Sequence, residues 1–159
     1  MREKTCCFTG HRRVPLEDCK KIKKSLIRNI EKLILNGVIF FGCGGARGFD
    51  MLAAESVLLL REKYPYIRLI MVYPCENQTA YWKRSDIERY NIIKKSADKY
   101  VYVSDYYYEG CMQKRNRHLI DCSSHCVCYL KYDKSGTSYT VNYAKKSGLN
   151  VINIADEIL

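Results

Sequence analysis

Three glycine-containing segments combine residue types that can hold a phosphate group. They are Thr9-Gly10-His11-Arg12-Arg13 (the first turn), residues 42–50 (the second turn) and Ser135-Gly136-Thr137-Ser138 (the late turn). Glycine lets a backbone approach a ligand closely, and free N–H groups at a helix N-terminus attract an anion. The three turns therefore indicate phosphate binding. The alternative is that their glycines only permit sharp turns and close packing of helix against strand.

Charged residues in and near these turns are candidates for ligand contact. Arg12 and Arg115 carry planar guanidinium groups that can pair with phosphate oxygens. His11 could donate to phosphate or act as an acid or base, or it could be a hydrogen-bonded loop histidine. Asp50 could reach a ribose hydroxyl from the first turn of a helix, or it could stabilise the helix dipole. The residues alone leave these alternatives open.

The second turn differs from two well-known nucleotide motifs. The dinucleotide fingerprint G-x-G-x-x-G, started at Gly42, would require glycine where Arg47 stands. No acidic residue closes the following strand at Tyr73-Pro74 to hold a ribose. No Gly-Lys-Ser/Thr follows either, so the turn is not a P-loop. These observations argue against a classical dehydrogenase or NTPase.

His118, Cys122, His125 and Cys126 are residue types that can bind zinc. His118 and Cys122 would share one face of a helix, as zinc ligands can. However, we expect a helix to end near Cys122 and a strand to begin near Cys126, which separates the four groups. We therefore expect no metal. The nine cysteines are odd in number and scattered, without an export signal, which favours reduced thiols.

The turns lie between elements that alternate strand and helix. Short, continuously apolar runs predict strands buried on both faces, at residues 5–9, 38–42, 67–73, 100–103, 126–130 and 151–154. Apolar residues at helical spacing predict helices at 15–36, 49–63, 81–97, 112–121 and 137–146. Strict alternation predicts an α/β fold: a three-layer, Rossmann-like sandwich with a mostly parallel sheet in one domain. Ligands of such sheets bind beyond the carboxyl ends of the strands.

Composition limits the class of protein. The 159 residues fit one domain, and 47% hydrophobic with 28% charged residues argues against a disordered chain. No apolar run approaches the roughly 20 residues that span a bilayer, and no signal peptide is evident, so we expect a cytoplasmic protein without membrane association. The net charge of +10 would attract polyanions. Lys20, Lys21, Lys23 and Lys24 face several sides of one helix, which suits solubility better than a nucleic-acid track.

Aromatic residues offer two further hypotheses. Trp82 with Tyr81 could stack on a base, but Trp82 at helical spacing is better explained as part of the core. In the predicted helices Leu59 and Ile87 are also expected to face inward. Tyr106-Tyr107-Tyr108 follows the fourth predicted strand and fits an exposed aromatic loop near the ligand or a subunit contact.

The ordered set of motifs resembles the YpsA-like proteins of the SLOG superfamily. Thr9-Gly10-His11-Arg12 resembles their T-G-[HY]-R start, and residues 44–55 resemble their G-G-x-x-G-x-[DE]-x-x-A-A-E segment. Similar features follow in the same order, over nearly the whole chain, at Pro74-Cys75-Glu76-Asn77-Gln78 with Trp82, at Arg115-Asn116-Arg117 and at Gly136-Thr137.

The resemblance implies a Rossmann-like domain that binds or senses a nucleotide or nucleotide derivative. It implies phosphate or ribose-phosphate contact for Gly44, Gly45 and Gly48, while Asp50 and Glu55 match acidic positions of the family. Glu55 could equally pair with a basic neighbour. From the turns and the resemblance together, the candidate ligand-binding residues are Gly10, His11, Arg12, Gly44, Gly45, Arg47, Gly48, Asp50, Arg115, Asn116, Gly136, Thr137 and Ser138.

Relatives within the superfamily suggest two other activities. The LOG phosphoribohydrolases use a glutamate in a late P-G-G-x-G-T-x-x-E loop, and Thr140 falls at that position. Threonine cannot act as a general acid or base near neutral pH, so we expect no strong hydrolase activity unless Asp50 or Glu55 substitutes. DprA relatives bind single-stranded DNA. We expect a small phosphorylated ligand and a homo-oligomer, rank nucleic acid behind them, and expect no cofactor beyond a bound nucleotide or nucleotide-sugar.

Overall fold

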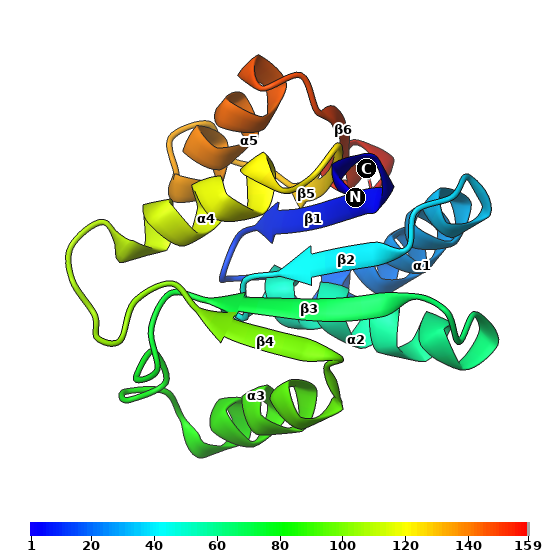
Figure 1. Cartoon of the computed structure of the whole chain (residues 1–159). Coiled ribbons are helices and arrows are strands. Elements are labelled where there is room, and N and C mark those ends of the chain that lie inside the picture. Colours follow the sequence, from blue (N-terminus) through cyan, green and yellow to red (C-terminus); the bar gives the residue numbers. More distant parts are fainter. Residues whose placement is uncertain (159) are drawn as a thin grey trace.

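Six strands form one parallel sheet in the order β4-β3-β2-β1-β5-β6 (Figure 1). The structure, a computed structural model, describes residues 1–158. Each predicted strand is present, with both ends within two residues of those expected. The strands are β1 (Thr5–Gly10), β2 (Phe40–Cys43), β3 (Arg68–Tyr73), β4 (Lys99–Tyr102), β5 (His125–Tyr129) and β6 (Asn150–Asn153).

Five α-helices cover the two faces of the sheet (Figure 1). The helices α1 (Cys19–Leu35), α2 (Phe49–Lys63) and α3 (Arg84–Ser96) pack side by side on one face. On the other face α4 (Cys111–Asp121) packs against α5 (Gly136–Lys146). The chain grows outward from β1 to β4 and then crosses to β5 on the other side of β1. The carboxyl ends of β1 and β5 therefore form a topological switch point, where such folds bind ligands.

Apolar burial explains why the predicted elements form. The middle of β1 is fully enclosed, with Cys6 and Cys7 at 0% exposure. The apolar stripe of α1, which includes Ile22, Leu26 and Ile30, packs onto the sheet and α2 in one core cluster. A second cluster joins the opposite sheet face to α4 and α5. Burial on both faces is what the continuous apolar strands predict.

Cysteine is a core residue in this fold. All nine thiols are free, and seven are buried. Cys19 is half-buried and Cys122 is exposed. Burial raises the pKa of Cys128 to about 12, and desolvation likewise raises the pKa values of Cys6 and Cys43. The buried thiols behave as small apolar side chains.

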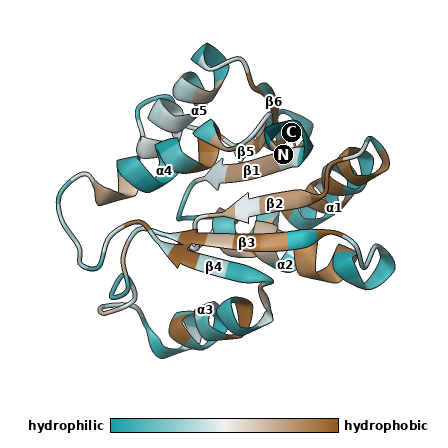
Figure 2. Ribbon diagram, viewed as in Figure 1, coloured by the Kyte–Doolittle hydropathy of each residue, from teal (hydrophilic) through white to brown (hydrophobic). Residues whose placement is uncertain are grey.

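The sheet face beside α4 is only partly covered. A mainly apolar groove of about 570 Å³ lies over β2, β3 and β4, lined among others by Phe40, Ile70, Val101 and Leu119. Figure 2 shows hydrophobic colours along β2 and β3. Among residues 1–158, no helix is long and apolar enough to cross a membrane.

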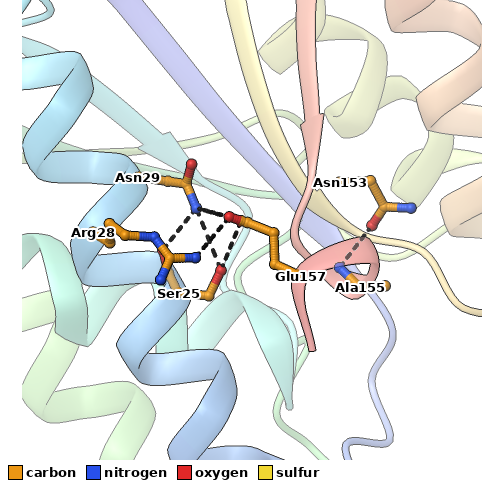
Figure 3. Close-up of polar contacts among 6 residues, drawn as sticks. All are labelled: Ser25, Arg28, Asn29, Asn153, Ala155 and Glu157. Atoms are coloured by element: carbon orange, nitrogen blue, oxygen red, sulfur yellow. Dashed lines mark hydrogen bonds and ion pairs between the residues drawn. The ribbon is translucent and has the colours of Figure 1, made fainter. Parts of the chain in front are cut away.

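The end of the described chain is tied to α1 by one carboxylate (Figure 3). Glu157 lies in the short helix η3 (Ile154–Glu157) and accepts hydrogen bonds from Ser25 Oγ at 3.1 Å and Asn29 Nδ2 at 2.9 Å. Arg28 adds an ion pair of 2.7 Å. Asn153 caps η3 by accepting from the Ala155 amide. This cluster holds the last strand and its short helix against α1.

Three expectations about helices were wrong. The helix expected from Tyr81 begins at Arg84, because residues 77–82 form successive turns and Tyr81 is 99% exposed. The helix expected from Pro15 begins at Cys19, after a 3₁₀ turn η2 (Leu16–Asp18). Leu59 does not face inward: it is 54% exposed, because it lies on the solvent side of α2.

Candidate functional site

A cavity of about 620 Å³ lies at the topological switch point and joins parts of all three turns. We call it the switch-point cavity. The first turn follows β1, the second turn precedes α2, and the late turn opens α5 after β5. The predicted site residues that line it are Gly10, His11, Arg12, Asp50, Arg115, Asn116, Gly136 and Thr137.

His11 joins the first turn to the loop after β5. Its Nε2 accepts hydrogen bonds from the Lys131 amide at 2.9 Å and the Tyr132 amide at 3.3 Å. An accepting Nε2 carries no proton, so the neutral ring holds its hydrogen on Nδ1. Burial lowers the pKa of His11, which agrees with a neutral ring. The structure thus shows the hydrogen-bonded loop histidine, with one wall of the cavity depending on it.

Asp50 holds the second turn together. Its Oδ2 accepts the Ala46 amide at 3.2 Å, and the residue is 7% exposed. Burial raises the pKa of Asp50 to about 6, although the positive charges of Arg115 and Arg12 oppose that shift. The Ala46 N–H that an anion could have used is therefore occupied by a protein carboxylate. Asp50 nevertheless lines the cavity, where its carboxyl group can meet a ligand.

Gly44 and Gly45 lie outside the switch-point cavity and serve close packing. A Cβ on Gly44 would lie 2.7 Å from the Arg115 guanidinium. Gly45 has φ +74°, and its Cβ would lie 2.4 Å from the Tyr73 ring. This is the packing alternative stated for the glycines. The arrangement gives no support to direct phosphate contact by these two residues.

Arg115 is committed to the protein interior. It is 3% exposed and donates to the carbonyl of Gly44, to the carbonyl of Val72 at 3.4 Å and to Asn116 Oδ1 at 2.7 Å. Its guanidinium therefore orders the second turn more than it offers a free fork to phosphate. Arg12 and Arg13 are exposed at the cavity mouth, and neither forms an ion pair within residues 1–158.

The late turn has the open geometry that an anion requires. Ser135 caps α5 by accepting the Ser138 amide at 3.1 Å on its Oγ. Gly136 and Thr137 begin the helix, so their N–H groups precede its internal hydrogen-bond ladder. Nothing lies within 4 Å of a Cβ built on Gly136. Phosphate binding therefore fits the late turn better than the second turn.

Thr140 lies outside the cavity lining. It is 3% exposed, and its hydroxyl donates to the Gly136 carbonyl at 3.0 Å. The chain thus places no carboxylate at this position of α5. The remaining predicted residue of the late turn, Ser138, contributes its amide to the cap.

A second depression adjoins the switch-point cavity and contains two more of the predicted residues. This basic groove has a volume of about 1300 Å³, is lined by Arg47 and Gly48, and shares Arg12 and Arg13 with the cavity. Glu55 also lines the groove but is bound by Arg89, at 2.6 and 2.8 Å, so its pairing alternative is the one observed.

Contacts decide the interpretation of Trp82. Trp82 packs against the core and meets Tyr90 edge to face at 5.6 Å between ring centroids, which confirms the core interpretation. Arg47 lies over the same indole at 5.1 Å. Tyr106 and Tyr107 are exposed, and Tyr107 lines the switch-point cavity.

Sequence reasoning missed other residues of the cavity lining. Arg13 and Tyr132 line it, as do Glu109 and Gln113. Arg13 could have been included because it directly follows Arg12. Tyr132 carried no local signal, since its position depends on how the loop after β5 folds over His11.

The residues considered for zinc are dispersed. His118 Nε2 and Cys122 Sγ are 3.9 Å apart on α4, while His125 Nδ1 lies 3.4 Å from Asn150 Nδ2 on the neighbouring strand. Within the described part of the chain, no three His, Cys, Asp or Glu side chains are grouped to hold a metal ion.

Sequence comparison decides the family. A family model described as the YspA SLOG family (YpsA) matches residues 6–154. The chain belongs to the YpsA family. This YpsA-family chain is 34% identical over 142 residues to the SPbeta prophage-derived protein YoqJ of Bacillus subtilis, covering 81% of this chain and 83% of YoqJ. It is 33% identical over 128 residues to a UPF0398 protein of Halalkalibacterium halodurans, covering 79% and 68% respectively.

Solved structures similar to the YpsA-family chain are DNA processing proteins A (DprA). The Helicobacter pylori protein, described for its single-stranded DNA binding mode, has a TM-score of 0.66 and 23% identity. The Streptococcus pneumoniae protein has a TM-score of 0.69 and 16% identity. The matches cover 92% and 94% of this chain but only 63% and 49% of those chains. At such identities the likeness shows a shared Rossmann-like fold.

Proposed function

We propose that this YpsA-family protein binds a nucleotide or nucleotide derivative in the switch-point cavity, through phosphate and ribose. The observation that carries the proposal is the meeting in one cavity of an open helix N-terminus, a buried carboxyl group and two arginines that form no ion pair with the described residues. The volume of about 620 Å³ is in the range of small-molecule sites.

Each part of such a ligand has a suitable partner. Phosphate oxygens would accept from the Gly136 and Thr137 amides and from Arg12 or Arg13. Ribose hydroxyls would donate to Asp50 when it is ionised. The base would lie toward Tyr132 or Tyr107, whose rings line the same cavity. Binding without strong turnover requires no further catalytic group.

Nucleic acid is a second partner class, supported by the fold likeness to DprA, the family and the basic character of the chain. The lysines at positions 20, 21, 23 and 24 are all exposed, yet only Lys23 lines either depression. The cations that do gather are concentrated at the carboxyl ends of the strands. That concentration favours a small phosphorylated ligand over a long single strand.

Cleavage of an N-glycosidic bond is the alternative activity, and Asp50 is the observation that favours it. A carboxyl group that titrates near pH 6 in a cavity can donate or accept a proton. Thr140 gives no such group, and Glu55 is held by Arg89. Asp50 is thus the residue through which a phosphoribohydrolase-like reaction would proceed.

The expected homo-oligomer remains a proposal. The partly covered face over β2, β3 and β4 would lose its contact with water if a second copy packed on it.

Replacing Gly136 by valine tests the binding proposal. The substitution has room for its Cβ, so the fold should survive, but the side chain would keep phosphate from the α5 N-terminus. We expect AMP and ADP-ribose to bind the variant at least about tenfold more weakly by calorimetry, which corresponds to ~1.4 kcal/mol.

The matched control is Ser85→Val, an exposed first-turn residue of α3 that lines neither the cavity nor the groove. It should bind like the unaltered protein. Equal affinity in Gly136→Val would remove the late turn from the site. Failure of the unaltered protein to bind either AMP or ADP-ribose would refute the proposed function.

A further inference from the structure

The basic groove carries more positive charge than its ion pairs neutralise. Six arginine or lysine side chains line it against two carboxylates, and Glu55 is already paired with Arg89. Within residues 1–158, the remaining basic side chains of the groove form no ion pair; they are Arg12, Arg13, Lys23, Arg47 and Lys83. Asp86 alone offsets them. Such a concave cluster of one sign attracts an anion.

An exposed aromatic ring stands beside these cations. Tyr81 lines the groove and is 99% exposed. The neighbouring Trp82 is fixed between Arg47 and Tyr90, so the segment that carries Tyr81 is anchored at its next residue. A free aromatic ring next to cations is the combination that proteins use for a nucleobase and its phosphate.

The groove and the switch-point cavity are continuous across the first turn. Arg12 and Arg13 line both depressions. A phosphate held by these two arginines would therefore border a nucleoside on either side: one beneath the α5 N-terminus and one toward Tyr81 and Lys83.

We propose that the basic groove is a second nucleotide subsite and that the ligand class of this protein is a phosphodiester-linked nucleotide. A dinucleotide is the smallest ligand that would fill both depressions. Arg12 and Arg13 hold the linking phosphate, Lys83 and Arg47 balance negative charge in the groove, and Tyr81 stacks on the second base. The inference rests on the proposed function, because the first nucleotide occupies the switch-point cavity.

Comparison of AMP with the 5′-phosphorylated dinucleotide pApA tests the second subsite on the full chain. We expect pApA to bind at least about tenfold more tightly by calorimetry. The double variant Tyr81→Ala/Lys83→Ala should lose about fivefold or more of the pApA affinity, as expected when one stacked base and one nearby positive charge are removed. Its AMP affinity should stay within about twofold, because neither side chain lines the switch-point cavity.

The control variant Tyr66→Ala/Lys24→Ala removes one exposed tyrosine and one exposed lysine away from both depressions. It carries the same change of charge and should bind pApA normally. A control that weakens pApA as much as Tyr81→Ala/Lys83→Ala would overturn the subsite and leave only general electrostatic attraction.

The remaining outcomes separate the subsite from the function it rests on. If AMP binds and pApA binds no better, the second subsite is wrong and the proposed function stands. If Gly136→Val leaves pApA binding intact while Tyr81→Ala/Lys83→Ala abolishes it, the groove binds nucleotides and the proposed cavity does not. Displacement of pApA by a triglutamate peptide at equal concentration would mark the groove as a surface for acidic peptides and overturn the inference.

Discussion

Asp50 lines the switch-point cavity, where burial raises its pKa to about 6. The folded protein therefore binds a proton at pH values where the unfolded chain, with an ordinary aspartate pKa of about 3.9, has released it. The stability that this proton gives is fully present below about pH 4 and is lost as pH rises through 6. The shift corresponds to roughly 3 kcal/mol of penalty for the ionised carboxyl group at neutral pH.

Asp50→Asn should remove this pH dependence. Subtracting the variant's free energy of unfolding from that of the unaltered protein cancels the titration of His11 and the other shared groups. We expect the difference to fall by about 2–3 kcal/mol between pH 4 and pH 7, measured by urea denaturation. A difference that stays constant over this range would show that burial does not raise the pKa of Asp50.

The same residue discriminates binding from catalysis. If the protein only binds nucleotides, ribose 5-phosphate release from AMP should be far slower than about 1 per second, a low value for an enzyme. Release at that rate, abolished by Asp50→Asn, would establish the N-glycosidase alternative instead.

Replacing a glycine in the turn between β2 and α2 should clearly destabilise the fold. Gly45→Ala would impose a side chain at φ +74° and bring its Cβ against the buried Tyr73 ring. We expect the free energy of unfolding to fall by about 2 kcal/mol or more, from backbone strain and overpacking together. Gly136→Ala, at an open position with ordinary φ, should cost little and serves as the matched control.

Equal stability of the two alanine variants would contradict this account of the second turn. It would also return Gly45 to the set of residues whose backbone is free to meet a ligand.

The order of strands and helices could be predicted from the sequence because the spacing of apolar residues is visible within each short segment. Strand β5 and helix α5 were expected within a residue or two of their observed ends. The helix that begins at Arg84 was predicted to begin at Tyr81, because Tyr81 and Trp82 extend the apolar pattern of the helix toward its N-terminus. In the structure, Tyr81 lies in solvent.

The candidate site could be predicted only as far as its turns. A glycine that admits a ligand and a glycine that admits a neighbouring side chain look the same in sequence. Gly44 faces Arg115 from α4, and Gly45 faces Tyr73 from β3. These partners lie far along the chain, so only the folded arrangement could show that packing uses these two positions.

At the scale of the whole molecule, both depressions lie at the carboxyl end of the sheet, the groove beside α1, α2 and α3 and the cavity beside α4 and α5. Arg12, Arg13 and Arg47 gather there without ion pairs within residues 1–158, whereas Arg61 pairs with Asp98 and Lys63 with Glu31 near the amino end of the sheet. The positive potential is therefore directed at the proposed ligand face, which should accelerate the capture of anionic ligands at low ionic strength.

Because most thiols are buried in different elements, their alkylation can report local unfolding of the folded chain. Of the nine cysteines, Cys122 is the exposed one, and the seven buried thiols are shielded from a reagent in solution. Desolvation also raises the pKa values of Cys6 and Cys43, which suppresses their thiolates. Brief alkylation at neutral pH should add one adduct at Cys122 and a slower one at Cys19, as read by peptide mass spectrometry. The time at which each later adduct appears would show when a particular element opens: Cys7 reports on β1, Cys43 on β2, Cys111 on α4 and Cys126 on β5. Simultaneous labelling of all four would mean that the sheet and α4 open as one cooperative unit, and staggered labelling would rank these elements by local stability.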